Sequence, residues 1–281
     1  MKKLVLALAL LLPGAAFGQT FYTGARASVG VDYKIKKGLH VEAREELRTA
    51  ENFTGIESLR TTIGVSYKPL SFLKVGVGYT LINPYKIGKE LDTDVYYTGF
   101  WAPKHRLFAD VTGTLKAGKF NFSLRERLQF THNAYDALNV YQSTRNALAL
   151  KSRIAVKYKG WRTVEPSLSF EVRAALNDPW GYTSGSAKTT NETNRKYFDY
   201  THTGYTHAYI NRLRLNLGAD IKLSKYHTLN PYVLFDYNMD YEIDTNGADK
   251  WATKGVRLFS DGTRWFYSMG LLVGLKYTFS F

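Results

Sequence analysis

The sequence has 281 residues, no cysteine and a formal net charge of +14 at pH 7. The lack of cysteine excludes a disulfide framework, so the fold has to be stabilised by other means. Such a charge often indicates a nucleic-acid partner, but the basic residues here are scattered singly along alternating segments, so no such partner is expected.

The first 18 residues have the pattern of a cleaved signal peptide. Lys2 and Lys3 precede an apolar run from Leu4 to Leu12, and small residues follow at the positions that a signal peptidase reads. The mature chain is therefore expected to begin at Gln19. Nine apolar residues fall short of the roughly 20 that a membrane-spanning helix needs. Residues 19–281 are expected to form a single domain, because no linker or change in composition divides them.

Most of the mature chain consists of segments in which apolar and polar residues alternate. Successive side chains of a strand point to opposite faces, so each segment has one apolar face. In chain order the segments lie near residues 26–33, 41–48, 59–67, 73–81, 107–115, 120–130, 148–158, 168–172, 213–223, 229–241 and 264–281. In the last one, every second residue from Trp265 to Phe281 is apolar. Strands of soluble sandwiches have about five or six residues, whereas a tilted spanning strand needs about 9 to 11.

Short turns between these segments alternate with long polar connections. The long connections lie near residues 49–58, 83–104, 132–143, 177–206 and 244–263. Transmembrane barrels have short periplasmic turns, long outer loops and an apolar band on the outside. The sequence therefore predicts an all-β fold, a transmembrane antiparallel up-and-down β-barrel.

The number of strands does not follow directly from the number of segments. Eleven segments can be counted, but single-chain bacterial barrels have even numbers of strands. We therefore expect about 10 to 12 strands. Either the segment near 26–33 is lumenal or poorly paired, or a short strand has escaped the count.

The final segment also resembles the signal that the outer-membrane insertion machinery recognises. The residues that carry this resemblance are Leu275, Tyr277, Phe279 and the terminal Phe281. It implies a location in the outer membrane of a Gram-negative-type bacterium. The expected partners are then outer-membrane lipid, lipopolysaccharide and the barrel-assembly machinery.

Arginine dominates the positions that would face the interior of the barrel. The candidate lumen-lining residues are Arg44, Arg48, Arg60, Arg106, Arg125, Arg127, Arg145, Arg153, Arg173, Arg212, Arg214 and Arg264. Rings of cationic side chains favour anions in pores, and a positive field raises the local anion concentration. One hypothesis is thus a porin-like diffusion channel that prefers small anionic solutes.

Two other functions stay open. In a plugged structural or surface-binding barrel, the arginines would pair with carboxylates across a filled lumen, as in barrels near eight strands. In an outer-membrane lipid-modifying enzyme, His202, Thr203 and His207 would be the candidates near the outer rim. No serine stands beside a histidine at the spacing familiar from outer-membrane phospholipases, so no catalytic residue is assigned. The sequence gives no expectation of a metal or cofactor.

Glu45 and Glu126 depart from the pattern, because both are in phase with the apolar residues of their segments. A carboxylate facing lipid is unfavourable. A β-bulge that turns each side chain inward is one explanation. A functional carboxylate or a contact between protomers is the other.

Several short stretches resemble an uncharacterised family of outer-membrane barrels, domain of unknown function 2490. They are VEAREELR at 41–48, GVSYK at 64–68, LKVGVGY at 73–79, KHRL at 104–107 and LRERL at 124–128. The resemblance implies a location and a fold. It implies no activity.

Overall fold

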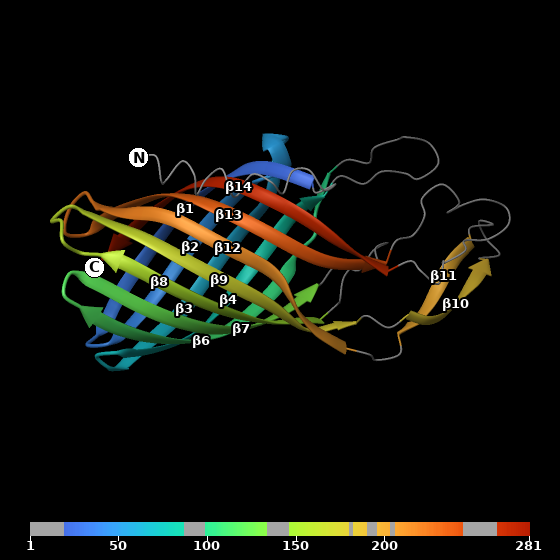
Figure 1. Ribbon diagram of the computed structural model, residues 1–281, viewed down its shortest axis with the longest axis horizontal. Coiled ribbons are helices and arrows are strands. Elements are labelled where there is room, and N and C mark those ends of the chain that lie inside the picture. The colour runs from blue at the N-terminus through green and yellow to red at the C-terminus, as the bar shows by residue number, and fades with distance from the viewer. Residues whose placement is uncertain are drawn as a thin grey trace, which may run out of the picture.

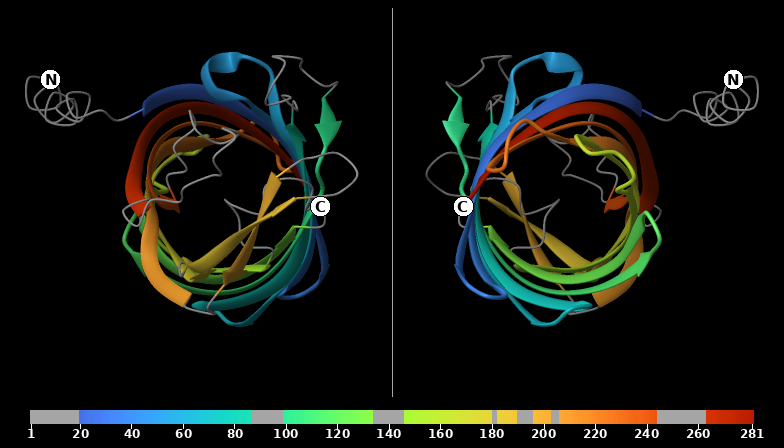
Figure 2. Two further views of the ribbon diagram at one scale, coloured as in Figure 1. Left: turned by 90° about the vertical axis from the view of Figure 1, so that its right-hand side faces the viewer. Right: turned by 90° about the vertical axis from the view of Figure 1, so that its left-hand side faces the viewer.

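The computed structural model describes residues 20–86, 99–133, 146–179, 182–189, 196–202, 206–243 and 263–281. The expected signal peptide lies outside these residues. In the described part, eleven long strands form a closed barrel (Figures 1 and 2). They are β1 (Thr20–Lys36), β2 (Leu39–Thr49), β3 (Ile56–Leu70), β4 (Leu73–Lys86), β6 (Lys104–Ala117), β7 (Phe120–Asn133), β8 (Asn146–Tyr158), β9 (Val164–Pro179), β12 (Thr206–Lys222), β13 (His227–Ile243) and β14 (Thr263–Ser280).

Three further strands lie outside the barrel wall. β5 (Phe100–Trp101) pairs with the end of β4, while β10 (Tyr182–Thr189) and β11 (Lys196–His202) pair with each other. A three-residue 3-10 helix, η2 (Glu51–Phe53), lies between β2 and β3. No helix among the described residues has the length and apolar character needed to cross a membrane.

The barrel closes through a parallel pair of strands. Neighbouring strands along the wall are antiparallel, but β1 pairs parallel with β14, in register from Thr20 with Ser268 to Asp32 with Ser280. The amide of Phe281 donates to the carbonyl oxygen of Asp32 at 3.1 Å, and the amide of Lys34 donates to Phe281 at 2.9 Å. This seam leaves no free edge in the wall.

The predicted barrel and the range of 10 to 12 strands are confirmed. The expectation that the segment near 26–33 is lumenal or poorly paired is wrong, since β1 is a full wall strand. The even-number argument fails because a parallel seam closes an odd number of strands. As a result β1 starts at the end of the barrel that carries the long connections, whereas the C-terminus lies at the end with the short turns (Figure 1).

Tight turns at the short-turn end use glycine where the backbone needs it. Gly38 joins β1 to β2 with φ of 82°, and Gly118 joins β6 to β7 with φ of 57°. This left-handed region favours glycine. A Cβ on Gly38 would also lie 2.9 Å from the carbonyl oxygen of Lys68, so this turn lies directly against the next one.

Burial in the barrel is the reverse of that in a soluble protein. Large apolar side chains such as Val77, Leu217 and Ile154 point outward, and Ile154 is 62% exposed. Ser58, Thr62, Gln129 and Asp236 are instead buried on the inner face. An apolar outside and a polar inside are what a wall between hydrocarbon and a polar lumen requires.

Aromatic rings gather at the short-turn end of this apolar surface. Tyr33 contacts Phe281 with ring centroids 4.9 Å apart, and Phe279 lies 5.0 Å from Phe281. Further along, Phe120 contacts Tyr158 at 5.2 Å. Four residues form the expected insertion signal, and two of them, Leu275 and Phe281, are exposed on the outside of the barrel at this same end. Their recognition by the insertion machinery stays a prediction.

The β-bulge expected at Glu45 and Glu126 is wrong. The register of β2 with β1 and β3 is unbroken at Glu45, which is exposed on the outer face. The register of β7 is also unbroken at Glu126, and there the hydroxyl of Ser152 on β8 donates to the carboxylate at 2.6 Å. Each carboxylate therefore stays on the outer face.

Candidate functional site: the charged lumen

The described residues enclose two cavities inside the barrel. The turn-side cavity, of about 690 Å³, reaches Lys157 and Thr278 toward the short turns. The loop-side cavity, of about 510 Å³, reaches Thr23 and Glu57 toward the long connections. Both are lined by Arg26, Arg44, Glu46 and Arg214, which therefore form a charged band between them.

The lining of the two cavities is strongly cationic. Thirteen cationic side chains face six carboxylates, a formal excess of seven positive charges. The cations are Arg26, Arg44, Arg48, Arg60, Arg106, Arg127, Lys151, Arg153, Lys157, Arg173, Arg212, Arg214 and Lys276. The carboxylates are those of Glu46, Glu51, Glu57, Glu171, Asp220 and Asp236.

Four of the cations form a continuous row across the inner wall, which we call the basic row. Arg127 on β7 pairs in register with Lys151 on β8, Lys151 with Arg173 on β9, and Arg173 with Arg212 on β12. Directly opposed residues on neighbouring strands have Cβ atoms about 4.5–5.5 Å apart, and like charges at that spacing are destabilising. The fold therefore holds four positive charges side by side, and Asp110 offsets part of the repulsion by pairing with Arg127 through both carboxylate oxygens.

The next row toward the short turns mixes the two signs. Arg125 on β7 lies opposite Arg153 on β8, and Arg153 lies opposite Glu171 on β9. Glu171 in turn lies opposite Arg214 on β12, and Arg214 lies opposite Asp236 on β13. Glu171 accepts a hydrogen bond from Arg125 at 3.1 Å and has Arg214 at 3.8 Å. The two carboxylates of this row also reach the basic row, since Glu171 lies 3.9 Å from Lys151 and Asp236 lies 4.0 Å from Arg212.

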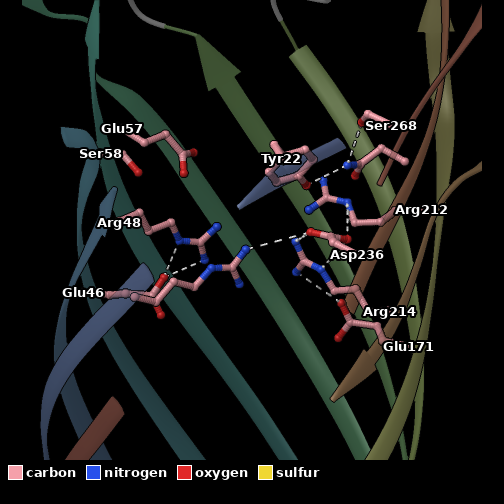
Figure 3. Close-up of polar contacts among 12 residues, drawn as sticks. Tyr22, Glu46, Arg48, Glu57, Ser58, Glu171, Arg212, Arg214, Asp236 and Ser268 are labelled. Atoms are coloured by element: carbon pink, nitrogen blue, oxygen red, sulfur yellow. Dashed lines mark hydrogen bonds and ion pairs between the residues drawn. The ribbon is translucent and has the colours of Figure 1, made fainter. Parts of the chain in front are cut away.

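Asp236 is the most enclosed charge in the lumen, with its side chain 2% exposed. Arg214 donates to its two oxygens at 3.0 and 2.7 Å, while Arg26 and Arg212 lie 3.9 and 4.0 Å away. Figure 3 shows this cluster on one wall and the Glu46 and Arg48 pair, with a contact of 2.5 Å, on the other. One carboxylate thus holds three arginines in place.

Aromatic rings lie flat on glycines of the inner wall and fix some of these cations. The Phe108 ring covers Gly78, where an added Cβ would lie 2.3 Å from it, and the Arg127 guanidinium stacks 4.0 Å above the ring centroid. Tyr232 covers Gly274 in the same way. Glycine therefore leaves room for a ring, and in the first case the ring supports a cation of the basic row.

Replacing Gly78 with alanine is expected to lower the free energy of unfolding by about 1–3 kcal/mol, because its Cβ would meet both Phe108 and a backbone oxygen 2.8 Å away. Denaturant unfolding in detergent micelles measures the change. Gly113→Ala is the matched control, since an added Cβ there meets nothing within 4 Å. Equal effects of the two substitutions would contradict the proposed close contact at Gly78.

The structure places the twelve predicted arginines as follows. Nine line one or both cavities, namely Arg44, Arg48, Arg60, Arg106, Arg127, Arg153, Arg173, Arg212 and Arg214. Arg125 contacts Glu171 without lining either cavity. Arg145 lies outside the described residues, as does the side chain of Arg264. A role of this set in anion passage stays a prediction.

Some lumen residues were not among the predicted set. Lys151 belongs to the basic row, and Lys157 and Lys276 line the turn-side cavity. Their positions alternate with outward apolar residues, so the periodicity that places arginines on the inner face places these lysines there too. For the enzyme alternative, Thr203 and the side chains of His202 and His207 lie outside the described residues. No cluster of three or more metal-ligating side chains occurs in the part that the structure describes.

Comparisons with known proteins give one family match. The family model described as "Protein of unknown function (DUF2490)" matches residues 23–197. No curated protein matches the sequence. Among solved structures, the chain is similar to "Outer-membrane expressed OmpT of Vibrio cholerae", with a TM-score of 0.39, 12% identity and coverage of 88% of this chain and 63% of that one. The in-vitro folded form of that Vibrio cholerae protein gives a TM-score of 0.36, 13% identity and coverage of 88% and 62%. This chain therefore spans less than two thirds of the length of those proteins.

Proposed function

This chain belongs to the DUF2490 family of proteins of unknown function, and from the geometry of its lumen we propose that it is an outer-membrane barrel that passes small anionic solutes by diffusion. The proposal has two parts. The first concerns the membrane and the second the solute.

The outer surface supports the membrane location. The eleven wall strands have 11 to 18 residues, enough to cross a bilayer with tilt. Every wall strand pairs on both sides, as a structure in hydrocarbon requires. Exposed apolar side chains such as Val77 and Ile154 cover the outside, and rings at the short-turn end match the aromatic girdle of such barrels.

The basic row is the observation that carries the preference for anions. Arg127, Lys151, Arg173 and Arg212 place four positive charges side by side across neighbouring strands. Nearby carboxylates contact three of them and offset part of the repulsion. The six lining carboxylates, with Asp110 beside Arg127, cannot neutralise thirteen cations, so the lumen keeps a positive field. A solute that passes through both cavities meets the charged band that they share, and their volumes of about 690 and 510 Å³ suit small solutes.

Planar-bilayer recording of the purified protein tests this function. We expect discrete conductance steps and, in a salt gradient, a reversal potential that favours anions. The double variant R173Q/R212Q should lower the anion-to-cation permeability ratio at least about twofold, because two charges leave the basic row. The control R162Q removes a cation from the exposed short turn between β8 and β9 and should leave the ratio unchanged.

Two results would contradict the proposal. A correctly folded protein that gives no conductance would favour the plugged structural barrel. Cation selectivity, or a ratio that the double variant leaves unaltered, would show that the basic row does not select the solute.

A further inference from the structure

Three cations in the turn-side cavity stand apart from the basic row. They are Arg44 on β2, Arg153 on β8 and Lys276 on β14. β8 lies on the opposite part of the wall, four strands from β14 in the order of the sheet, while β2 lies two strands from β14 on the other side. The three side chains therefore converge on one space from different sides of the barrel.

Each carboxylate that lines this cavity is already bound to another cation. Glu46 pairs with Arg48 at 2.5 Å and Glu171 with Arg125 at 3.1 Å. Asp220 pairs with Lys157 and accepts a hydrogen bond from the amide of Asn230 at 2.6 Å. Among the described residues, no carboxylate lies within the 4.0 Å of an ion pair from Arg44, Arg153 or Lys276.

The three charges are close enough to act on one another. Arg44 repels both Arg153 and Lys276, while Glu171 attracts Arg153 and Asp220 attracts Lys276 from beyond ion-pair distance. The Nε of Arg153 is buried and has no hydrogen-bond partner in the described part of the protein. A buried donor without a partner is costly, and so is mutual repulsion among cations that no carboxylate contacts directly. Both costs would be removed by an anion in the cavity.

We propose that the turn-side cavity binds a small oxyanion of the phosphate class through Arg44, Arg153 and Lys276. Guanidinium groups present a planar fork of donors that matches phosphate oxygens, and lysine adds a point charge. Three converging cations suit an anion with two negative charges. The volume of about 690 Å³ exceeds that of phosphate alone and lies in the range of small-molecule sites, so a phosphorylated organic solute also fits.

This inference rests on the proposed function in one respect, because the lumen has to admit the anion. Binding itself needs no conduction. Isothermal titration calorimetry of the full mature protein in a zwitterionic detergent, at constant ionic strength in chloride, measures it directly. One arm titrates inorganic phosphate and a second titrates glycerol 3-phosphate, which separates the free anion from a phosphorylated solute.

We expect saturable binding of at least one of the two probes by the folded protein. Each of R44Q, R153Q and K276Q should weaken it at least about tenfold, since each removes a charge-assisted contact. R153K should weaken it less than R153Q, because it keeps the charge and loses the fork. R162Q, in the exposed short turn, should bind like the unaltered protein. The shift in gel mobility on heating shows that each variant is folded.

Absence of saturable binding by the folded protein in both arms would overturn the inference. So would binding that all three neutralising variants retain, because the anion would then lie elsewhere. These outcomes differ from a failure of the proposed function. An anion-selective channel without saturable phosphate binding overturns the oxyanion site alone, whereas a barrel that binds phosphate but carries no current overturns only the channel.

Discussion

Replacing Asp236 with asparagine is expected to lower the free energy of unfolding by about 3–5 kcal/mol. The side chain is 2% exposed and stands among Arg26, Arg212 and Arg214. Asparagine keeps the shape but not the charge, so three arginines would lose the carboxylate they share, and Glu171 would remain only near Arg214, at 3.8 Å. Unfolding by guanidinium chloride in detergent micelles, followed by the loss of β-sheet circular dichroism, measures the change.

Asp32→Asn provides a matched control. Asp32 is 40% exposed and pairs with His40 at 2.9 Å near the short-turn end, so water screens its charge. Its loss should cost less than about 1 kcal/mol. If Asp236→Asn were equally mild, lumen water would already solvate the three arginines, and Asp236 would not organise the band between the cavities.

The sequence predicts which side chains of each strand point inward, but it does not predict which of them lie side by side on neighbouring strands. Alternation places Arg127, Arg173 and Arg212 on the inner wall. Their adjacency depends on the register between strands, and long connections such as residues 134–145 and 180–205 do not fix a register. The short turns do fix it, so the hairpins were predictable and the basic row was not.

The closure of the barrel was hidden for a similar reason. The alternation of β1 and β14 is the same whichever way the strands run, so a parallel pairing leaves no trace in either segment. An assumed even number of strands then made β1 seem to be a segment outside the wall. The observed register from Thr20 with Ser268 to Asp32 with Ser280 shows that backbone hydrogen bonding, which any residue can supply, decides the closure.

Glu126 shows how a local compensation can replace a bulge. A bulge would have cost wall hydrogen bonds, whereas a hydrogen bond from Ser152 satisfies the carboxylate on the outer face. The sequence distance of 26 residues between the two concealed this partner. The sequence shows that Glu126 is in phase with lipid-facing residues. It does not show that Ser152 supplies the hydrogen bond that satisfies the carboxylate.

Replacing Ile154 with arginine is expected to destabilise the protein by about 2–4 kcal/mol in lipid vesicles. Ile154 is 62% exposed near the middle of β8, between Leu124 on β7 and Phe170 on β9. In water, a polar substitution at such an exposed position changes stability by less than about 0.5 kcal/mol. The size of the effect in reversible urea unfolding therefore reports the solvent that this surface meets.

Leu223→Arg separates the membrane interior from the interface. Leu223 is 59% exposed, nearly as much as Ile154, but follows the end of β12 at the short turns. Arginine near the interface costs only about 0–1 kcal/mol, because its head group reaches water. A large penalty at Ile154 with a small one at Leu223 is the pattern that hydrocarbon of bilayer thickness produces. Small penalties at both sites would mean that water covers the apolar outer surface of the barrel. The barrel would then not span a membrane, and its lumen could not connect two compartments.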